Sequence, residues 1–462
     1  MSAIEKTTAT WRVLLLRGNP PELLVVETAE GLELPQFEIP KAGRVASALN
    51  ALARQRLDLP VYSLYSLPEA ATGNASAGVR YQVMEAIGGA AGTLQSGQWL
   101  ALHQAGEARF SRTPDQAAVR AGRGQVPFNL RRPRGPFATP GWLRPLREWV
   151  ENSLRPFGLR LTGRFEQWNA STQFSLIRFE TECGAVWFKA VGPPNEREFP
   201  TTVRLAGLFP AFTPRVIASV PEWNAWLAFE APGTRLAGLR DARAWVNTAR
   251  DLGRLQAASV SRSDELRTLP LRDVRIPTLL PTIEPYFARL ARFMALQQSV
   301  PPEPLPATEL QGLASFTREA LLRLAEVGMP DSLGHLDLNP ENIVVCEGRT
   351  VFLDWAEGSF GPPLFSLFHL LEHFSRSGED PGAEASLVDE YRRAWAETGL
   401  ASQFRAAYSL SKFLAVFAHG VSTDPWREEA EAQDPRVAGY YRSLARRMQR
   451  YQTSSDLCHA FA

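Results

Sequence analysis

The chain has 462 residues, of which 45% are hydrophobic and 21% are charged, and its formal net charge is +1. This length exceeds one ordinary hydrophobic core, so we expect two or three domains. The balanced charge gives no case for binding nucleic acid or an anionic membrane through the whole surface.

The cysteine content and the apolar pattern favour a cytoplasmic protein. The three cysteines, Cys183, Cys346 and Cys458, are scattered and match neither a disulfide framework nor a zinc motif. The apolar run at 13–16 is too short for the core of a signal peptide. No window approaches the roughly 20 apolar residues that cross a bilayer, so no membrane contact is expected.

Residues 1–110 are expected to form a small α+β domain. Strand formers flank the turn sequence at 18–21, and apolar residues at helical spacing follow. The expected elements are strands at 11–16, 22–27, 61–66 and 79–87 and a helix at 42–57.

Residues 111–140 are expected to form a linker. The stretch 109–147 holds nine arginines against the single acid Asp115, with proline and glycine throughout. This composition is typical of an extended strap rather than a packed element. Such a strap either forms salt bridges with its neighbours or touches a phosphate-rich partner, and we favour the salt bridges.

The remaining sequence predicts a strand-rich piece at 141–232 and a helix-rich piece at 233–462, which join at Ala231-Pro232-Gly233. In the first piece we expect helices at 142–154 and 196–208 and strands at 173–180, 185–191, 214–219 and 225–230. In the second piece helical patterns lie at 240–258, 282–297, 308–327, 363–375, 384–398, 403–418 and 437–452.

The sequence SLGHLDLNPENIVVCEGRTVFLDW at 332–355 contains the main candidates for chemistry. Asn342 follows Asp337 by five residues, and Asp354 comes twelve residues later, after two apolar strand segments. One carboxylate can face an attacking hydroxyl, while an amide oxygen and a second carboxylate are ligands that suit magnesium. The same order and nearly the same spacing occur in protein kinases.

The loop has two alternative interpretations, a capping turn and a calcium loop. A lone Asp337 would fit a turn residue that caps backbone amides. A calcium loop fails because Pro340 lies inside it, Asn342 stands where glycine is needed, and the twelfth position lacks a glutamate. His335 is expected to bond the backbone rather than perform chemistry.

Lys189 lies in the apolar strand VWFKAV, where a lysine must find an anion or reach solvent. Glu198, on the next expected helix, is a partner for a lysine that grips the α- and β-phosphates of a nucleotide. Glu196 is the competing partner. The alternative is an edge-strand lysine and a surface glutamate.

Two further segments are candidates for nucleotide contacts. The stretch 166–172 lacks a GxGxxG motif, but the small residues near Ser171 and Thr172 would let backbone amides approach phosphate. The strand end at Glu230 is the expected hinge, where adenine would bond to the backbone.

Three charged features have ordinary explanations. His369, Glu372 and His373 match the H-x-x-E-H pattern of inverted zinc peptidases, but a packed helix explains them better. The last helix carries the basic residues Arg442, Arg446, Arg447 and Arg450, which a solvated face explains. An anionic pocket for a cationic ligand or a solvated helix face would account for Glu372, Glu379, Asp380, Glu384, Asp389 and Glu390.

Residues from about 135 to 420 resemble the aminoglycoside phosphotransferase and choline kinase-like families of small-molecule kinases. The resemblance lies in VWFKAV, REFPTTVRLAGLFP, AFEAPGTRL, GHLDLNPENIVV and FLDWAEG. It implies an α+β, bilobal protein-kinase-like fold with ATP and Mg²⁺ bound between the lobes. It assigns nucleotide gripping to Lys189, its ion pair to Glu198, the base to Asp337, and metal ligands to Asn342 and Asp354.

The chain departs from the family pattern HGDxHxGN at Leu336, Asn339 and Glu341, and Glu341 adds a carboxylate near the metal. Ser366 also replaces an aspartate that is common in the G-x-P-x-x-D-L segment, so a structural anchor is expected to be missing.

The N-terminal piece resembles, more faintly, a Nudix domain. Its expected helix lacks the R-E-x-x-E-E carboxylates that bind a catalytic metal, so we expect this domain to be catalytically inactive.

These observations predict an ATP-dependent phosphotransferase that acts on a hydroxyl of a small molecule. The alternative is a pseudokinase-like protein that binds a nucleotide or metabolite with little catalysis. The joint presence of Lys189, Asp337, Asn342 and Asp354 favours the enzyme, whereas the altered loop favours the alternative.

Overall fold

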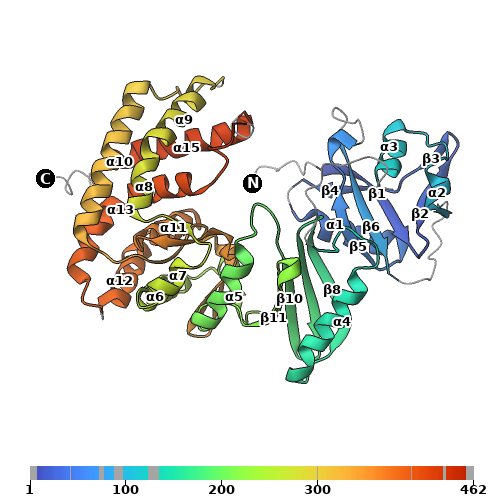
Figure 1. The fold of residues 1–462 in the computed structure, drawn as a ribbon, viewed down its shortest axis with the longest axis horizontal. Coiled ribbons are helices and arrows are strands. Elements are labelled where there is room, and N and C mark those ends of the chain that lie inside the picture. Colours follow the sequence, from blue (N-terminus) through green and yellow to red (C-terminus); the bar gives the residue numbers. More distant parts are fainter. Residues whose placement is uncertain are drawn as a thin grey trace. The chain divides into compact units, whose positions relative to one another are not determined.

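The computed structural model describes residues 8–41, 43–71, 78–87, 97–122, 135–298, 300–396, 398–429 and 433–453. The chain divides into two compact units. Unit 1 comprises residues 1–199 and 215–230, and unit 2 comprises residues 200–214 and 231–462. Figure 1 shows the strands of unit 1 in blue and green and the helices of unit 2 mainly in yellow to red.

Among its described residues, the N-terminal part of unit 1 forms a seven-stranded mixed sheet. The strand order is β3-β2-β1-β6-β5, with β4 paired to β1 and β7 paired to β2. Only the β1–β6 pair is parallel among these pairings. The strands are β1 (Thr8–Arg17), β2 (Glu22–Thr28), β3 (Gly31–Glu33), β4 (Gln36–Pro40), β5 (Val61–Ser66), β6 (Val79–Ala86) and β7 (Gly97–Ala101), and the helices are α1 (Val45–Leu57), α2 (Leu102–Ala105) and α3 (Thr113–Gly122).

Strand β1 is covered on both faces. Residues 11–16 are all buried, and successive side chains belong to two different cores. Leu15 packs in one core with Leu49 of α1, and Leu14 packs in the other with Val119 of α3. A continuous apolar run is typical of a strand that is buried on both faces.

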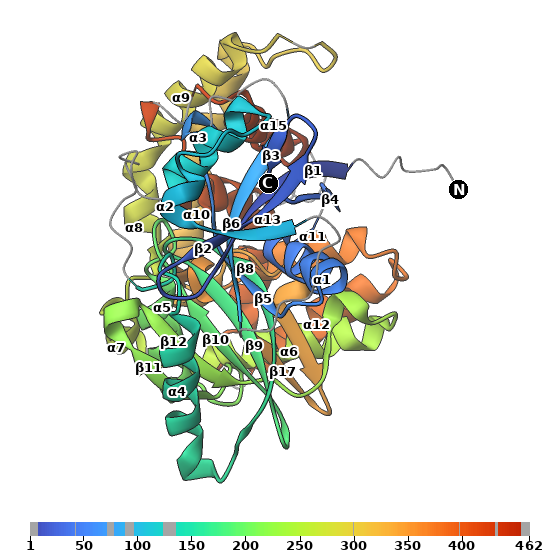
Figure 2. The ribbon, with the colours of Figure 1, turned by 90° about the vertical axis from the view of Figure 1, so that its right-hand side faces the viewer.

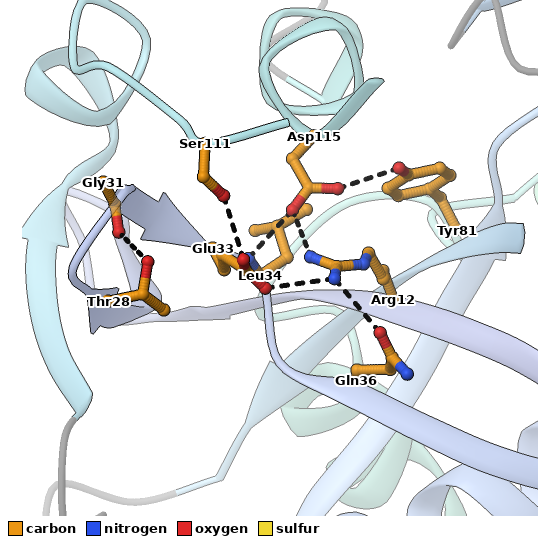
Figure 3. Close-up of polar contacts among 9 residues, drawn as sticks. All are labelled: Arg12, Thr28, Gly31, Glu33, Leu34, Gln36, Tyr81, Ser111 and Asp115. Atoms are coloured by element: carbon orange, nitrogen blue, oxygen red, sulfur yellow. Dashed lines mark hydrogen bonds and ion pairs between the residues drawn. The ribbon is translucent and has the colours of Figure 1, made fainter. Parts of the chain in front are cut away.

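Helix α3 corrects the expectation of an extended linker after residue 110. The single acid of the arginine-rich stretch, Asp115, lies on this helix and is completely buried. Its carboxylate accepts hydrogen bonds from Arg12 Nη1 at 2.5 Å, the Leu34 amide at 3.1 Å and the Tyr81 hydroxyl at 2.8 Å (Figure 3). The guanidinium of Arg12 also contacts Glu33. This polar network ties α3 to the sheet, and residues 123–134 of the expected linker lie outside the described residues.

The second sheet of unit 1 is antiparallel, with the order β11-β12-β10-β9-β8 in the part of the chain that the structure describes. Helix α4 precedes it, and α5 follows β10. The elements are α4 (Leu143–Leu154), β8 (Leu161–Ala170), β9 (Ser175–Thr181), β10 (Gly184–Ala190), α5 (Glu198–Leu208), β11 (Val216–Val220) and β12 (Ala225–Phe229).

A buried polar contact joins the two sheets of unit 1. Gln167 of β8 accepts hydrogen bonds from Asn50 of α1 at 3.0 Å and from the amide of Ser63 of β5 at 2.7 Å. It also donates to the Ser63 carbonyl at 2.9 Å. Figure 2 shows α1 close to β5 and β8. Leaving a buried amide without its hydrogen-bond partners costs free energy, so these hydrogen bonds are retained in the folded state. The N-terminal sheet and the β8–β12 sheet are therefore joined by a specific contact.

Unit 2 is mainly helical. Its described helices are α6 (Ala242–Val260), α7 (Ser263–Arg267), α8 (Ile276–Leu279), α9 (Ile283–Ala295), α10 (Ala307–Val327), α11 (Leu364–Arg376), α12 (Ala383–Ala396), α13 (Ala401–Ser422) and α15 (Pro435–Gln452). Helices α9, α10 and α15 pack side by side (Figure 1). The short helices α7 and α8 are the ones that the helical patterns did not predict.

Two small sheets of unit 2 carry the polar loops. One has the order β13-β16-β17, and the other has the order β14-β18-β15. Their strands are β13 (Thr234–Arg235), β14 (Arg272–Asp273), β15 (Ser332–His335), β16 (Ile343–Cys346), β17 (Arg349–Phe352) and β18 (Gly358–Gly361). Gly233, just before β13, has a φ of +122°, and a Cβ there would lie 2.2 Å from the Val345 carbonyl oxygen, so only glycine fits.

None of the helices in the described ranges has the length and apolar character needed to span a membrane.

The buried network on α3 yields a stability prediction. Replacing Asp115 with alanine should lower the free energy of unfolding by about 3–5 kcal/mol, because the Arg12 charge would lose its buried partner. The matched control is Glu22→Ala, which breaks the more exposed Arg17–Glu22 pair of the same sheet and should cost at most about 1 kcal/mol. Thermal unfolding of the full chain measures both, and equal shifts would contradict the assignment.

Candidate functional site

The loop that bears Asp337 begins where the buried strand β15 ends. β15 pairs with β18 along its whole length. The His335 amide donates to Ser366 Oγ at 2.8 Å, and the Leu336 amide donates to the Glu357 carbonyl at 3.0 Å. These bonds determine the direction in which the chain leaves the strand, so Asp337 follows a rigid backbone.

His335 joins the two polar segments of the site. Its Nδ1 accepts a hydrogen bond from the Asp337 amide at 3.1 Å, and this leaves the proton on Nε2, which donates to the Leu353 carbonyl at 3.0 Å. The ring is buried and lies against Trp355, with 5.0 Å between ring centroids. The prediction that His335 bonds the backbone is confirmed.

Asn342 lies against Asp337. Its amide nitrogen donates to the Asp337 carboxylate at 3.2 Å and, more weakly, to the Asp337 carbonyl at 3.4 Å. The loop between them is held by Asn339, whose side chain accepts from the Glu341 amide at 3.1 Å. Because the amide nitrogen of Asn342 faces Asp337, its oxygen points away from the Asp337 carboxylate.

The β16–β17 hairpin brings the segment that bears Asp354 back to the Asp337–Asn342 loop. The hairpin ladder continues beyond its strands, since the Leu353 amide donates to the Asn342 carbonyl at 2.8 Å. Asp354 follows in the left-handed region, with φ 61° and ψ 62°. Residues other than glycine rarely adopt this conformation, and such strain is concentrated at functional sites. The structure therefore brings Asp337, Asn342 and Asp354 onto adjoining backbone segments.

Glu341 does not follow the expectation that it adds a carboxylate beside the metal ligands. Its side chain is 59% exposed and pairs with Arg235 at 3.2 Å. Arg235 Nη1 also donates to the Glu341 carbonyl at 3.2 Å. This departure from the family pattern thus forms a surface contact with β13.

Ser366 corrects the expectation of a missing anchor. It is buried at the start of α11, and its hydroxyl accepts from the His335 amide. A Cβ added to Gly334 would lie 2.9 Å from Ser366 Oγ, so the helix and the strand are closely packed. A neutral hydroxyl therefore anchors the loop, and no buried carboxylate has to be compensated.

Lys189 and Glu198 form an ion pair within unit 1. Lys189 Nζ lies 2.5 Å from Glu198 Oε1, and the two side chains are 15% and 2% exposed. Lys189 belongs to the central strand β10 and lies over the Trp226 ring. Glu198 is the first residue of α5, where the helix dipole favours a negative charge. The alternative of an edge lysine and a surface glutamate is wrong.

Asn224 is a positioning residue that the sequence did not reveal. Its side chain donates to the Val191 carbonyl at 2.9 Å and to the Glu196 carbonyl at 3.0 Å. These bonds hold the segment that leads from Lys189 into α5. Asn224 has a left-handed φ of 51°, but its partners lie far away in sequence, so no local pattern indicated them.

The expected phosphate loop is shorter than the sequence indicated. Residues 166–170 belong to strand β8, so the turn begins only at Ser171. The Ser171 hydroxyl accepts from the amides of Gln173 at 3.2 Å and Phe174 at 3.0 Å. Thr172 lies between Ser171 and Gln173 in this turn. A phosphate group would therefore have to compete with bonds inside the turn for these amides.

Glu230 ends unit 1, at the expected hinge. Its carboxylate accepts two bonds from Arg178, at 2.7 and 2.9 Å, and one from Trp187 Nε1 at 3.0 Å. Its amide donates to the Ala185 carbonyl at 3.0 Å. Because the side chain and the amide are engaged, the backbone carbonyl is the Glu230 group to consider for adenine.

Three histidines of unit 2 are held in the neutral form. His369 and His373 lie on α11, and His419 lies on α13. Burial lowers the pKa of all three, and it lowers that of His369 far below the ordinary value. The positive or protonatable groups that face His369 are His419, Arg447, His373 and His335. Within the described residues, no cluster of three His, Cys, Asp or Glu side chains could hold a metal.

Comparison with known proteins agrees with this arrangement. Residues 195–401 match the model of the family described as "Phosphotransferase enzyme family", or APH. No curated protein matches the chain.

Several solved structures are similar to the chain at low identity. They include a putative aminoglycoside phosphotransferase from Ralstonia eutropha (16% identity, TM-score 0.44, covering 66% of this chain and 97% of that one). Choline kinase LicA from Streptococcus pneumoniae has 13% identity and a TM-score of 0.39, covering 66% and 99% of the two chains. Macrolide 2′-phosphotransferase MphH from Brachybacterium faecium has 18% identity and a TM-score of 0.41, covering 63% and 97%.

The observed order of elements agrees with the protein-kinase-like fold that the sequence predicts. The antiparallel sheet of β8–β12 with α5 after β10, followed by a helical unit with the Asp337 loop and the β16–β17 hairpin, has the order of that fold. The segment 195–401 is matched to the phosphotransferase enzyme family, so the resemblance is confirmed there. The Nudix-like interpretation of residues 1–110 stays a prediction, because the match does not extend to them.

The Ser366 anchor generates a prediction. Ser366→Ala leaves the buried His335 amide without its acceptor, which should lower the free energy of unfolding by about 1–3 kcal/mol. Ser366→Thr keeps the hydroxyl and is the matched variant. Thermal unfolding measures the stability of both variants. If Ser366→Ala is as stable as Ser366→Thr, the hydroxyl does not anchor the His335 amide.

The buried histidines predict a pH dependence of stability. The unfolded chain takes up protons near pH 6.5, whereas the lowered pKa values keep the folded imidazoles neutral. The free energy of unfolding should therefore be fully present above pH 6.5 and fall as the pH drops below it. His369→Gln should flatten this slope between pH 7.5 and 5.5, whereas the same change at exposed His103 should not. Denaturant titrations at each pH test this, and an unchanged slope would contradict it.

Proposed function

We propose that the protein transfers the γ-phosphoryl group of ATP to a hydroxyl of a small molecule. The observation that supports this most directly is the Asp337–Asn342 pair, held on a backbone that β15, His335 and Ser366 make rigid. The family match over residues 195–401 includes this pair and Asp354.

Asp337 is proposed as the catalytic base. The acceptor oxygen forms a bond to the γ-phosphorus, while the bond between that phosphorus and the β–γ bridging oxygen breaks and leaves with ADP. The acceptor hydroxyl gives its proton to Asp337, late in the reaction because the transition state is loose. The hydrogen bond from Asn342 orients the Asp337 carboxylate before the acceptor arrives.

Lys189 is proposed to hold the α- and β-phosphates, with Glu198 as its positioning partner. Since Glu198 is nearly fully buried, its charge keeps the lysine in one place. Ser171 and Thr172 are proposed to contact phosphate through the β8–β9 turn. Glu230 is proposed to offer its carbonyl to the adenine amino group.

The residues present fit a magnesium ion that is bound together with ATP. Asn342 would contribute its amide oxygen, which faces away from Asp337, and Asp354 would contribute a carboxylate. Magnesium commonly takes one or two protein ligands and completes its shell with phosphate and water. When bound, it would neutralise charge on the phosphates. The cytoplasmic location expected from the cysteine content stays a prediction.

Replacing the proposed base should separate catalysis from binding. Asp337→Asn should lower kcat by about 10²–10⁴-fold, because general base catalysis contributes that much. Its affinity for magnesium-ATP should stay close to that of the wild type. Phosphoryl transfer from radiolabelled ATP to a panel of sugars, amino sugars and amino alcohols measures kcat, and calorimetry measures nucleotide affinity.

The matched control is Glu341→Gln, which makes the same acid-to-amide change in the same loop at an exposed side chain. It should retain near wild-type turnover. If wild type and Asp337→Asn bind magnesium-ATP but neither transfers phosphate to any acceptor, the nucleotide-binding alternative replaces the enzyme.

A further inference from the structure

Unit 2 contains a cavity lined by side chains of α11, α12, α13 and α15. The space open to the centres of water-sized molecules is about 90 Å³. This is room for several water molecules or for the end of a small ligand. Its polar lining includes His369 and Glu372 of α11, Lys412 and His419 of α13, and Arg447 of α15.

His369 supplies an unmet hydrogen-bonding group in this cavity. The residue is half-buried, and its Nε2 atom is buried and has no hydrogen-bond partner among the described residues. Its ring lies 4.9 Å from that of His419, whose Nε2 contacts the Tyr440 hydroxyl at 2.5 Å. Buried polar groups are generally paired with protein, water or ligand, so a partner for His369 is expected in the cavity.

The cavity lies close to the proposed base. Burial lowers the pKa of His419 and of His373, and the Asp337 carboxylate opposes the shift in both, as the Leu336 backbone does for His419. Electrostatic effects of this kind weaken with distance. The His419 end of the cavity therefore lies toward the loop that bears Asp337.

The charges that line the cavity cancel. Glu372 and Glu384 are offset by Lys412 and Arg447, and Glu372 forms ion pairs with both Arg376 and Arg447. Of the two interpretations of these acids, an anionic pocket or a solvated helix face, the pairing of Glu372 with two arginines favours the second. Of the other acids in that set, Asp389 pairs with Arg392 and Glu390 pairs with Arg393.

We infer that this cavity receives the hydroxyl-bearing end of a neutral sugar or polyol, whose hydroxyl groups bond His369 and His419 beside Asp337. This inference rests on the proposed function and names its acceptor class. A hydroxyl both donates and accepts, so it pairs with either nitrogen of a neutral imidazole. An ammonium group only donates and a carboxylate only accepts, and each would bring an unbalanced charge into a lining whose charges balance.

The first test compares acceptors that differ in one group. Transfer of labelled phosphate is measured for glucose against glucosamine and glucuronate, and for galactose against galactosamine and galacturonate. The neutral member of each set should have a kcat/KM about tenfold higher or more, since a site built around hydroxyl groups discriminates on them. A charged member that is used equally well or better overturns the acceptor class, while the proposed function stands.

The second test measures binding without turnover. The sugars are titrated by calorimetry into Asp337→Asn and into that variant with His369→Phe, which keeps the ring and removes both nitrogens. The Kd should rise about tenfold in the double variant, as expected for one lost hydrogen bond, and His369→Gln should restore part of it. Exposed His103→Gln is the control, and thermal unfolding checks that each variant folds.

The outcomes separate the two proposals. Neutral sugars that bind through His369 but are never phosphorylated by the wild type would overturn the proposed function and leave the cavity as a sugar site. Equal binding with and without the imidazole, or no binding at all, would mean that the cavity holds only water and would overturn the inference.

Discussion

The candidate site depends on the buried imidazole of His335. Its two ring nitrogens and its own backbone amide are all hydrogen-bonded, and they connect the Asp337 amide, the Leu353 carbonyl and Ser366. Through its ring and its backbone amide together, this one residue links β15, the hairpin and α11. Unmade bonds are costly in such a buried setting, which makes the arrangement rigid. The Asp337 and Asp354 loops take their positions from this contact.

The departures from the family pattern have different structural consequences. Glu341 turns outward to Arg235, so it adds no charge next to Asp337. Ser366 stands where an aspartate is common in the family pattern, and its hydroxyl accepts a backbone hydrogen bond without a buried charge. Both changes leave the Asp337–Asn342 contact in place. The altered loop is therefore compatible with phosphoryl transfer, and it does not by itself favour a protein without catalysis.

The N-terminal sheet is connected to the sheet that carries Lys189. Gln167 of β8 bonds to α1 and β5, and apolar residues from both sheets belong to one core. The Asp115 network holds α3 against the N-terminal sheet in turn. The N-terminal part of unit 1 is thus connected to β8 through packed and hydrogen-bonded groups.

The sequence alone determined the fold class, most helices and strands, and the residues that bear the candidate chemistry. Periodic burial is a local property, and the spacing of Asp337, Asn342 and Asp354 follows from one loop and one hairpin, so both can be read from neighbouring residues. Only the tertiary structure showed that Asp115 is a buried anchor on a helix and that Ser366 and Asn224 hold distant backbone. It also showed that Glu372, Asp389 and Glu390 are paired with arginines. These outcomes depend on hydrogen bonds and ion pairs between residues far apart in the chain. Such partners are chosen by packing in three dimensions and leave no periodic trace in the sequence.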